Sequence, residues 1–137
     1  GGSSDIFVLK LNSSGTFQWV NTFSGTGEDT GFGIAVDSSG NSYTTGYFGG
    51  TVDFGGGDVT SGGSSDIFVL KLNSSGTFQS VNTFSGTEED IGYGIAVDSS
   101  GNSYTTGYFG NFAGTVDFGE GNVTTAGYGD IFVLKLN

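Results

Sequence analysis

Short runs of alternating residues predict an all-β fold. The first, DIFVLKLN at residues 5–12, turns apolar side chains to both faces of an extended chain: Ile6 and Val8 to one face, and Phe7, Leu9 and Leu11 to the other. A strand that is apolar on both faces is typical of a strand packed between two layers. We therefore expect this run to lie inside a stacked or radial array of sheets.

Four such runs make up one unit, and turn residues separate them. The predicted strands are residues 5–12, 16–23, 31–37 and 42–48. They are joined in pairs by NSSG at 12–15 and DSSG at 37–40, where an amide or carboxylate comes first and glycine last. This is the chemistry of a type I turn closing into a bulge, so each unit is predicted to be two β-hairpins. A further run at 51–54 is either an edge strand or a surface loop.

The run at residues 31–37 differs on its two faces. Phe32, Ile34 and Val36 fill one face, whereas Gly33 and Ala35 leave the other nearly bare. A bare face lets a neighbouring backbone approach closely, as in the crowded interior of an array.

The sequence is a tandem repeat. Residues 2–26 recur at 63–87 with one change, Trp19 to Ser80, so these two positions must have different surroundings. A third copy of DIFVLKLN closes the chain. We divide the sequence into repeat unit 1, repeat unit 2 and the start of a third unit, at residues 1–61, 62–125 and 126–137.

Composition excludes several classes of protein. Fourteen acidic residues against three lysines give a net charge of −11, which argues against a nucleic-acid partner because phosphate binding needs clustered cations. With no methionine, no signal segment and no long apolar run, the sequence reads as a mature or excerpted segment without membrane insertion.

The residue inventory also argues against an enzyme. Histidine and cysteine are absent, and no serine stands in a G-x-S-x-G context. Lys10, Lys71 and Lys135 occupy one repeat position, and repetition in every unit favours an architectural role. We expect no catalytic residues and no organic cofactor.

One acidic loop in each repeat is a candidate calcium site, because calcium favours clustered oxygen ligands. The candidate ligands are Glu28, Asp29, Glu88, Glu89 and Asp90. The alternative is a solvated acidic turn that discourages aggregation.

Two further surface features have competing interpretations. Asn12, Asn73 and Asn122 stand in N-x-S/T sequons, although the first two are already required by their turns. Exposed aromatics could stack on sugars, and packing within strands is the competing interpretation; these are Trp19, Tyr43, Tyr47, Tyr104 and Tyr108.

The segments GFGIAVDSSGNSYTTGYF and DIFVLKLNSSGTFQWVNTFSG closely resemble the SBBP-type β-propeller repeats of bacterial secreted and surface proteins. The resemblance covers nearly the whole chain. It implies four-stranded propeller blades and an extracellular or cell-surface location, and it implies no reaction.

The strand count is incomplete for a propeller, because closed propellers have about 4 to 8 blades and this chain supplies roughly two. If GIAVD is the innermost strand, the order along the chain is third and fourth strands, a full blade, then first, second and third strands. That makes nine strands, with DIFVLKLN present one time too many.

We expect the two terminal strands to be the assembly surface, since unpaired edges invite association. The residues concerned are Ile6, Phe7, Val8, Leu9, Leu11, Ile131, Phe132, Val133, Leu134 and Leu136. The expected function is a structural protein whose copies join head to tail, with a filament favoured over a ring, and deletion of residues 130–137 should then abolish assembly. The alternative is a ligand-binding module for carbohydrate or protein, closed by oligomerisation or by further repeats of a longer chain.

Overall fold

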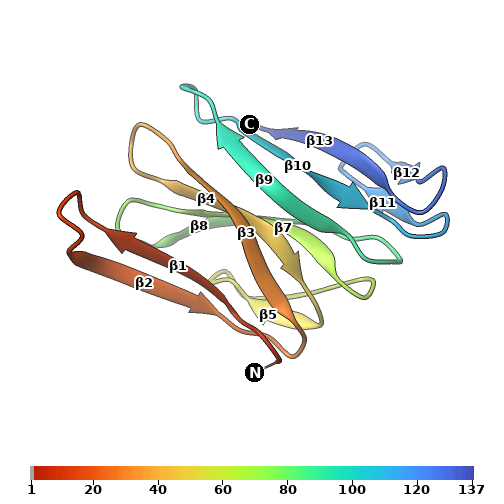
Figure 1. Cartoon of the computed structure of the whole chain (residues 1–137), viewed down its shortest axis with the longest axis horizontal. Helices are drawn as coiled ribbons and strands as arrows, with labels where there is room; N and C mark the ends of the chain where they lie inside the picture. The colour runs from red at the N-terminus through yellow and green to blue at the C-terminus, as the bar shows by residue number, and fades with distance from the viewer. Residues whose placement is uncertain (1) are drawn as a thin grey trace.

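The computed structural model describes residues 2–137, and all of its regular structure is β-strand (Figure 1). The long strands are β1 (Ile6–Leu11), β2 (Phe17–Phe23), β3 (Asp29–Val36), β4 (Ser42–Phe48), β7 (Asp66–Leu72), β8 (Phe78–Phe84), β9 (Ile91–Val97), β10 (Ser103–Phe109) and β13 (Asp130–Leu136). The short strands are β5 (Thr51–Asp53), β6 (Asp58–Thr60), β11 (Thr115–Asp117) and β12 (Asn122–Thr124). The described part of the chain has no helix that is long and apolar enough to cross a membrane.

The long strands form three antiparallel sheets, which we call blades 1 to 3. Blade 1 is the hairpin β1-β2, blade 2 has the order β3-β4-β7-β8, and blade 3 has the order β9-β10-β13. Only blade 2 has four strands within the described residues. The predicted fold class, an all-β array of propeller-like blades that is incomplete as a single chain, is confirmed.

The predicted strand order is also confirmed. The chain supplies the third and fourth strands of blade 1, all of blade 2, and the first three strands of blade 3. Blade 2 runs from residue 29 to residue 84 and so combines strands from both sides of the sequence boundary at 61/62. The run at 51–54 is settled as a strand, β5, but its partner β6 was not predicted.

The turns have the predicted geometry. Gly15 has a φ of 77°, and the carbonyl of Asn12 accepts a hydrogen bond from its N–H at 2.9 Å. The Asn12 side chain accepts two more backbone N–H groups, from Ser14 and Thr16, each at 2.9 Å. Next to this turn, the pairing register of β1 and β2 shifts between Lys10 and Leu11, which marks a β-bulge.

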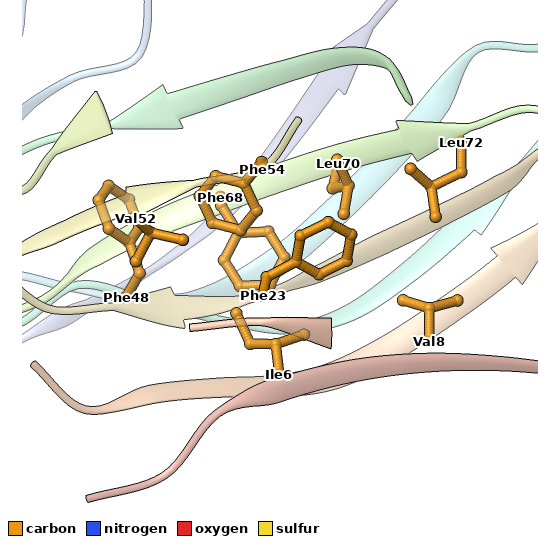
Figure 2. Close-up of a cluster of buried hydrophobic side chains, with 9 residues drawn as sticks. All are labelled: Ile6, Val8, Phe23, Phe48, Val52, Phe54, Phe68, Leu70 and Leu72. Carbon is orange, nitrogen blue, oxygen red and sulfur yellow. The ribbon is translucent and has the colours of Figure 1, made fainter. Parts of the chain in front are cut away.

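Two hydrophobic clusters hold the blades together. The first, shown in Figure 2, joins blade 1 to blade 2 and consists of Ile6, Val8, Phe23, Phe48, Val52, Phe54, Phe68, Leu70 and Leu72. The second joins blade 2 to blade 3 and consists of Ile67, Val69, Phe84, Phe109, Val116 and Phe132. The core of the molecule therefore lies between blades rather than within them.

Each small hairpin contains a phenylalanine that packs in or against one of these clusters. Phe54, directly after β5, is fully buried, and its ring centroid lies 5.7, 5.7 and 5.0 Å from those of Phe23, Phe48 and Phe68. Phe118, directly after β11, makes the equivalent contacts between blades 2 and 3. The small hairpins are thus part of the contact between blades.

The bare face of β3 meets a neighbouring backbone, as predicted. A Cβ atom added to Gly33 would lie 3.0 Å from the carbonyl oxygen of Tyr93 and 3.2 Å from the Cα of Gly94. Glycine is therefore required where β3 of blade 2 packs against β9 of blade 3. Gly94 holds the same position in β9, and its added Cβ would meet only the Thr106 methyl at 3.6 Å.

We expect Gly33→Val to destabilise the fold by about 1–3 kcal/mol, because the new side chain would force β3 and β9 apart. The matched substitution Gly94→Val should leave the free energy of unfolding nearly unchanged. Urea denaturation of the two variants and the wild type measures the difference, and equal losses from both would contradict this account of the glycine.

Candidate functional site: the open blade faces

One sequence occupies three different environments in this chain. DIFVLKL forms β7 in the middle of the molecule, where Ile67, Phe68, Val69, Leu70 and Leu72 are all buried. Blades on both sides cover β7, which accounts for the apolar character of both its faces. The same residues in β1 and β13 are covered on one side only.

The two ends leave opposite faces of this strand uncovered. In β1, Ile6 and Val8 are buried, whereas Phe7 is 67% exposed and Leu9 and Leu11 are exposed as well. In β13, Phe132 is buried, and the residues equivalent to the buried pair of β1, Ile131 and Val133, are 85% and 77% exposed. We call the first set the head face and the second set the tail face.

The head and tail faces are the two halves of one contact that the chain already makes twice. Ile6 and Val8 of blade 1 pack in one cluster with Phe68 of blade 2. Ile67 and Val69 of blade 2 pack in one cluster with Phe132 of blade 3. A tail face therefore carries the residue types that pack against a head face inside the chain, and the predicted assembly residues divide between these two faces and the core.

The acidic loops support backbone amides and phenols. Asp29 is fully buried and accepts N–H groups from Gly25 at 2.8 Å and Gly49 at 3.3 Å. Its repeat mate Asp90 is also fully buried and accepts the N–H of Gly110 at 2.8 Å. These two carboxylates hold the start of the first strand of a blade against the loop that follows the second.

The three glutamates of the predicted calcium site point elsewhere. Glu28 accepts the hydroxyl of Tyr47 at 2.8 Å, Glu89 accepts the hydroxyl of Tyr108, and Glu88 is exposed. Among the described residues, no group of three or more acidic side chains comes together in a way that could hold a metal ion.

The family profile of the SBBP β-propeller repeat matches residues 18–47 and 84–108. The resemblance to SBBP repeats is confirmed. The first match runs from β2 through β3 into β4, and the second covers β9 and most of β10. The chain matches no curated protein.

The difference between the two repeats at Trp19 and Ser80 follows from their neighbours. Trp19 lies over the hairpin turn of the next blade, where its indole N–H donates to the carbonyl of Ser74 at 3.2 Å. Asn21 donates to the carbonyl of Gly76 in the same turn at 2.7 Å. Ser80 instead lines a pocket together with Leu136 of β13.

The tyrosines singled out in the sequence have partners within the blades. Tyr43 and Tyr104 donate to Asp37 and Asp98 at 3.3 and 3.2 Å. Lys71 lies 5.0 Å from the ring centroid of Tyr43, and Lys135 lies 5.7 Å from that of Tyr104. These contacts fit the interpretation as strand packing, and they explain why β7 and β13 both carry lysine at this position.

Buried carboxylates make the stability of this fold depend on pH. Burial raises the pKa of Asp90 to about 6, with the charges of Asp66 and Glu88 adding to the effect against the hydrogen bond from Gly110. Burial also raises the pKa of Asp29. Oδ1 of Asp66 and Oδ2 of Asp90 are buried without a hydrogen-bond partner in the described part of the chain.

We expect Asp90→Asn to raise the melting temperature by several degrees at pH 8 and to have little effect near pH 4. The folded-state pKa of Asp90 lies above the ordinary value of 3.8, so the folded state binds the proton more tightly than the unfolded state does. Its charged form therefore opposes folding increasingly as pH rises through about 6. Thermal melts between these pH values test the trend.

Asp58→Asn is the matched control for this substitution. Asp58 is exposed, and the second repeat carries Asn122 at the same position. A gain in melting temperature that is the same at all pH values, or equal in both variants, would contradict the assignment to Asp90.

Calcium binding by the acidic loops remains a prediction with a direct test. If Glu28 and Asp29, or their repeat mates, bind calcium in the folded protein, EDTA should lower the melting temperature, because a ligand of the native state stabilises it by mass action. An unchanged melting curve after chelation would rule the site out.

Proposed function

We propose that this chain is a non-enzymatic structural module of the SBBP type that associates end to end with further copies of itself outside the cell. The observation that carries the proposal is the match between the head face and the tail face. Each is one half of a contact that the chain makes internally between its own blades.

Burial favours such an association. One junction would cover Phe7, Leu9 and Leu11 of one copy together with Ile131 and Val133 of the next. Full burial of an apolar side chain contributes about 1.5–3 kcal/mol, so five side chains that are already partly covered contribute on the order of 5 kcal/mol. Association itself costs an estimated 4–15 kcal/mol, so contact between faces alone would be weak.

Open strand edges add a second driving force. Within the described residues, β1 pairs only with β2, and β13 pairs only with β10. Neither strand contains proline, and Lys10 and Lys135 are the only charged side chains inside them apart from Asp130 at the start of β13. Backbone hydrogen bonds to a second copy would satisfy these edges.

The remaining parts of the proposal rest on composition and on the family resemblance. The absence of histidine and cysteine supports a role without catalysis. SBBP-type repeats imply an extracellular or cell-surface location and no reaction. Because the head and tail faces differ, the contact is heterologous, and it yields a closed ring or an open filament according to its rotation.

Mixing two blocked variants tests the end-to-end contact. Phe7→Asp with Leu9→Asp blocks the head face, and Ile131→Asp with Val133→Asp blocks the tail face. If copies join by contact between the intact head and tail faces, each variant alone should be a monomer, because its remaining face has no partner. An equimolar mixture should form a one-to-one dimer and nothing larger, whereas the wild type should form larger species, as measured by light scattering after size exclusion.

Phe112→Asp serves as the control, since Phe112 is exposed and belongs to neither face. This variant should associate as the wild type does. A wild type that stays monomeric at high concentration, or a mixture no heavier than its components, would refute the proposal.

A further inference from the structure

The N-terminal and C-terminal strands fit the same place in a blade. β13 pairs with β10 from Ser103↔Leu136 to Phe109↔Asp130. In blade 2, β7 pairs with β4 in the equivalent register, from Ser42↔Leu72 to Phe48↔Asp66. β1 has the same sequence as β7 and β13, so it can pair with β10 in this register too.

Within the described residues, blade 1 has no inner strands that pair with β1 and cover β3. A groove lies between the free edge of β1 and the exposed face of β3, lined by Val8, Leu9, Phe32, Ile34 and Thr44. Between blades 2 and 3, by contrast, β9 packs against both β3 and β4. The groove is thus where the first and second strands of a complete blade would lie.

We propose that copies of this chain join by strand exchange, in which the β1-β2 hairpin of one copy replaces β13 on β10 of the next. This inference rests on the proposed self-association but replaces the contact between the head and tail faces, because Ile131 and Val133 leave together with β13. The variant with Ile131→Asp and Val133→Asp should then still associate by itself. The junction is then a four-stranded blade with the order β9-β10 from one copy and β1-β2 from the other. In the free chain, β13 pairs with the edge of β10 until the hairpin of another copy replaces it.

The burial of the two competing strands decides which of them leaves. β13 is a single strand whose outer face is open, with Ile131 and Val133 exposed. β1 is held in a hairpin with β2, and its Ile6 and Val8 are buried against blade 2 of its own copy. Exchange therefore releases β13, the less buried strand, and keeps the β1-β2 hairpin intact.

The incoming β2 would bring Phe17 to an open pocket on blade 3. In blade 2, Phe78 of β8 packs over Gly55 and Gly56 at the tip of the small hairpin, so closely that a Cβ on Gly56 would overlap its ring. The equivalent tip on blade 3 borders an open pocket whose lining includes Phe118, Gly119 and Gly121. Leu134 and Leu136 of β13 also line it, and the exchange would put Leu9 and Leu11 of β1 in their places. The residue equivalent to Phe78 in β2 is Phe17, which is exposed in the free chain.

The exchange would also give Lys10 and Gly94 the neighbours that the equivalent residues of the other repeats have. Lys71 and Lys135 each lie over a tyrosine of the second strand, but Lys10 has no such ring and donates to the carbonyl of Ser74 instead. Pairing β1 with β10 would place Lys10 opposite Tyr104. The open side of Gly94 would meet β3 of the next copy, as Gly33 meets β9 within one copy.

The exchange also changes the strand count. With β13 released, every copy in an assembly contributes strands for two complete blades, the intact blade 2 and one shared junction blade. Rings of two, three or four copies would then hold four, six or eight blades, which spans the range of about 4 to 8 found in closed propellers. Each copy then supplies a whole number of blades, so the strand count no longer favours a filament over a ring.

A reversible disulfide that holds β13 on β10 tests the exchange. Thr106→Cys with Val133→Cys places two thiols on directly opposed residues of β10 and β13, in a chain that otherwise has no cysteine. When the disulfide is oxidised, β13 cannot leave, and we expect self-association to weaken at least about tenfold. Reduction of the same protein should restore it, as measured by sedimentation velocity over a concentration series.

Comparing the two redox states of one protein removes any effect of the substitutions themselves. A second variant, Gly94→Val, should fold normally yet weaken association, because only the exchanged junction brings β3 of another copy onto this residue. Deletion of residues 130–137 should maintain or strengthen association, opposite to the expectation from sequence.

The outcomes separate the two proposals. If the oxidised and reduced proteins associate equally, exchange is wrong and simple contact between the head and tail faces remains. If the wild type and the reduced variant both stay monomeric, self-association and exchange are refuted together.

Discussion

Packing between blades is the interaction on which the rest of this structure depends. The DIFVLKL strand is apolar on both faces, so it needs a neighbouring blade on each side to leave water. β7 has both neighbours and is buried along its whole length apart from Lys71. Both hydrophobic clusters lie between blades, so a single blade of this sequence would have no core of its own.

The polar features of the chain serve the same packing. Glycines with positive φ close the hairpin turns, and Gly33 lets β3 approach β9. Buried Asp29 and Asp90 tie the start of one blade to the loop beside it through backbone amides. Burying carboxylates in a chain with a net charge of −11 opposes folding at neutral pH, and the hydrophobic contacts between blades must offset that cost.

Repetition explains why the two ends of this chain are complementary. Each repeat presents one face to the blade before it and another to the blade after it. Any run of such repeats has one face of each kind at its two ends, and because β1 and β13 share one sequence, both can pair with the same edge of β10. Self-association and strand exchange are therefore two consequences of one repeated contact.

The sequence by itself determined the nine long strands and the hairpin turns, and its resemblance to SBBP repeats implied the blade order. The strands and turns depend on local signals, namely the alternation in residues 5–12, the glycines of the turns and the exact repetition of DIFVLKL. Only the tertiary structure decided which copy of that strand is buried on both faces, because identical sequences differ solely in their neighbours. It also placed Phe54 and Phe118 in the core and turned the acidic loops toward backbone amides, which local sequence does not encode because these contacts join residues from different strands and blades.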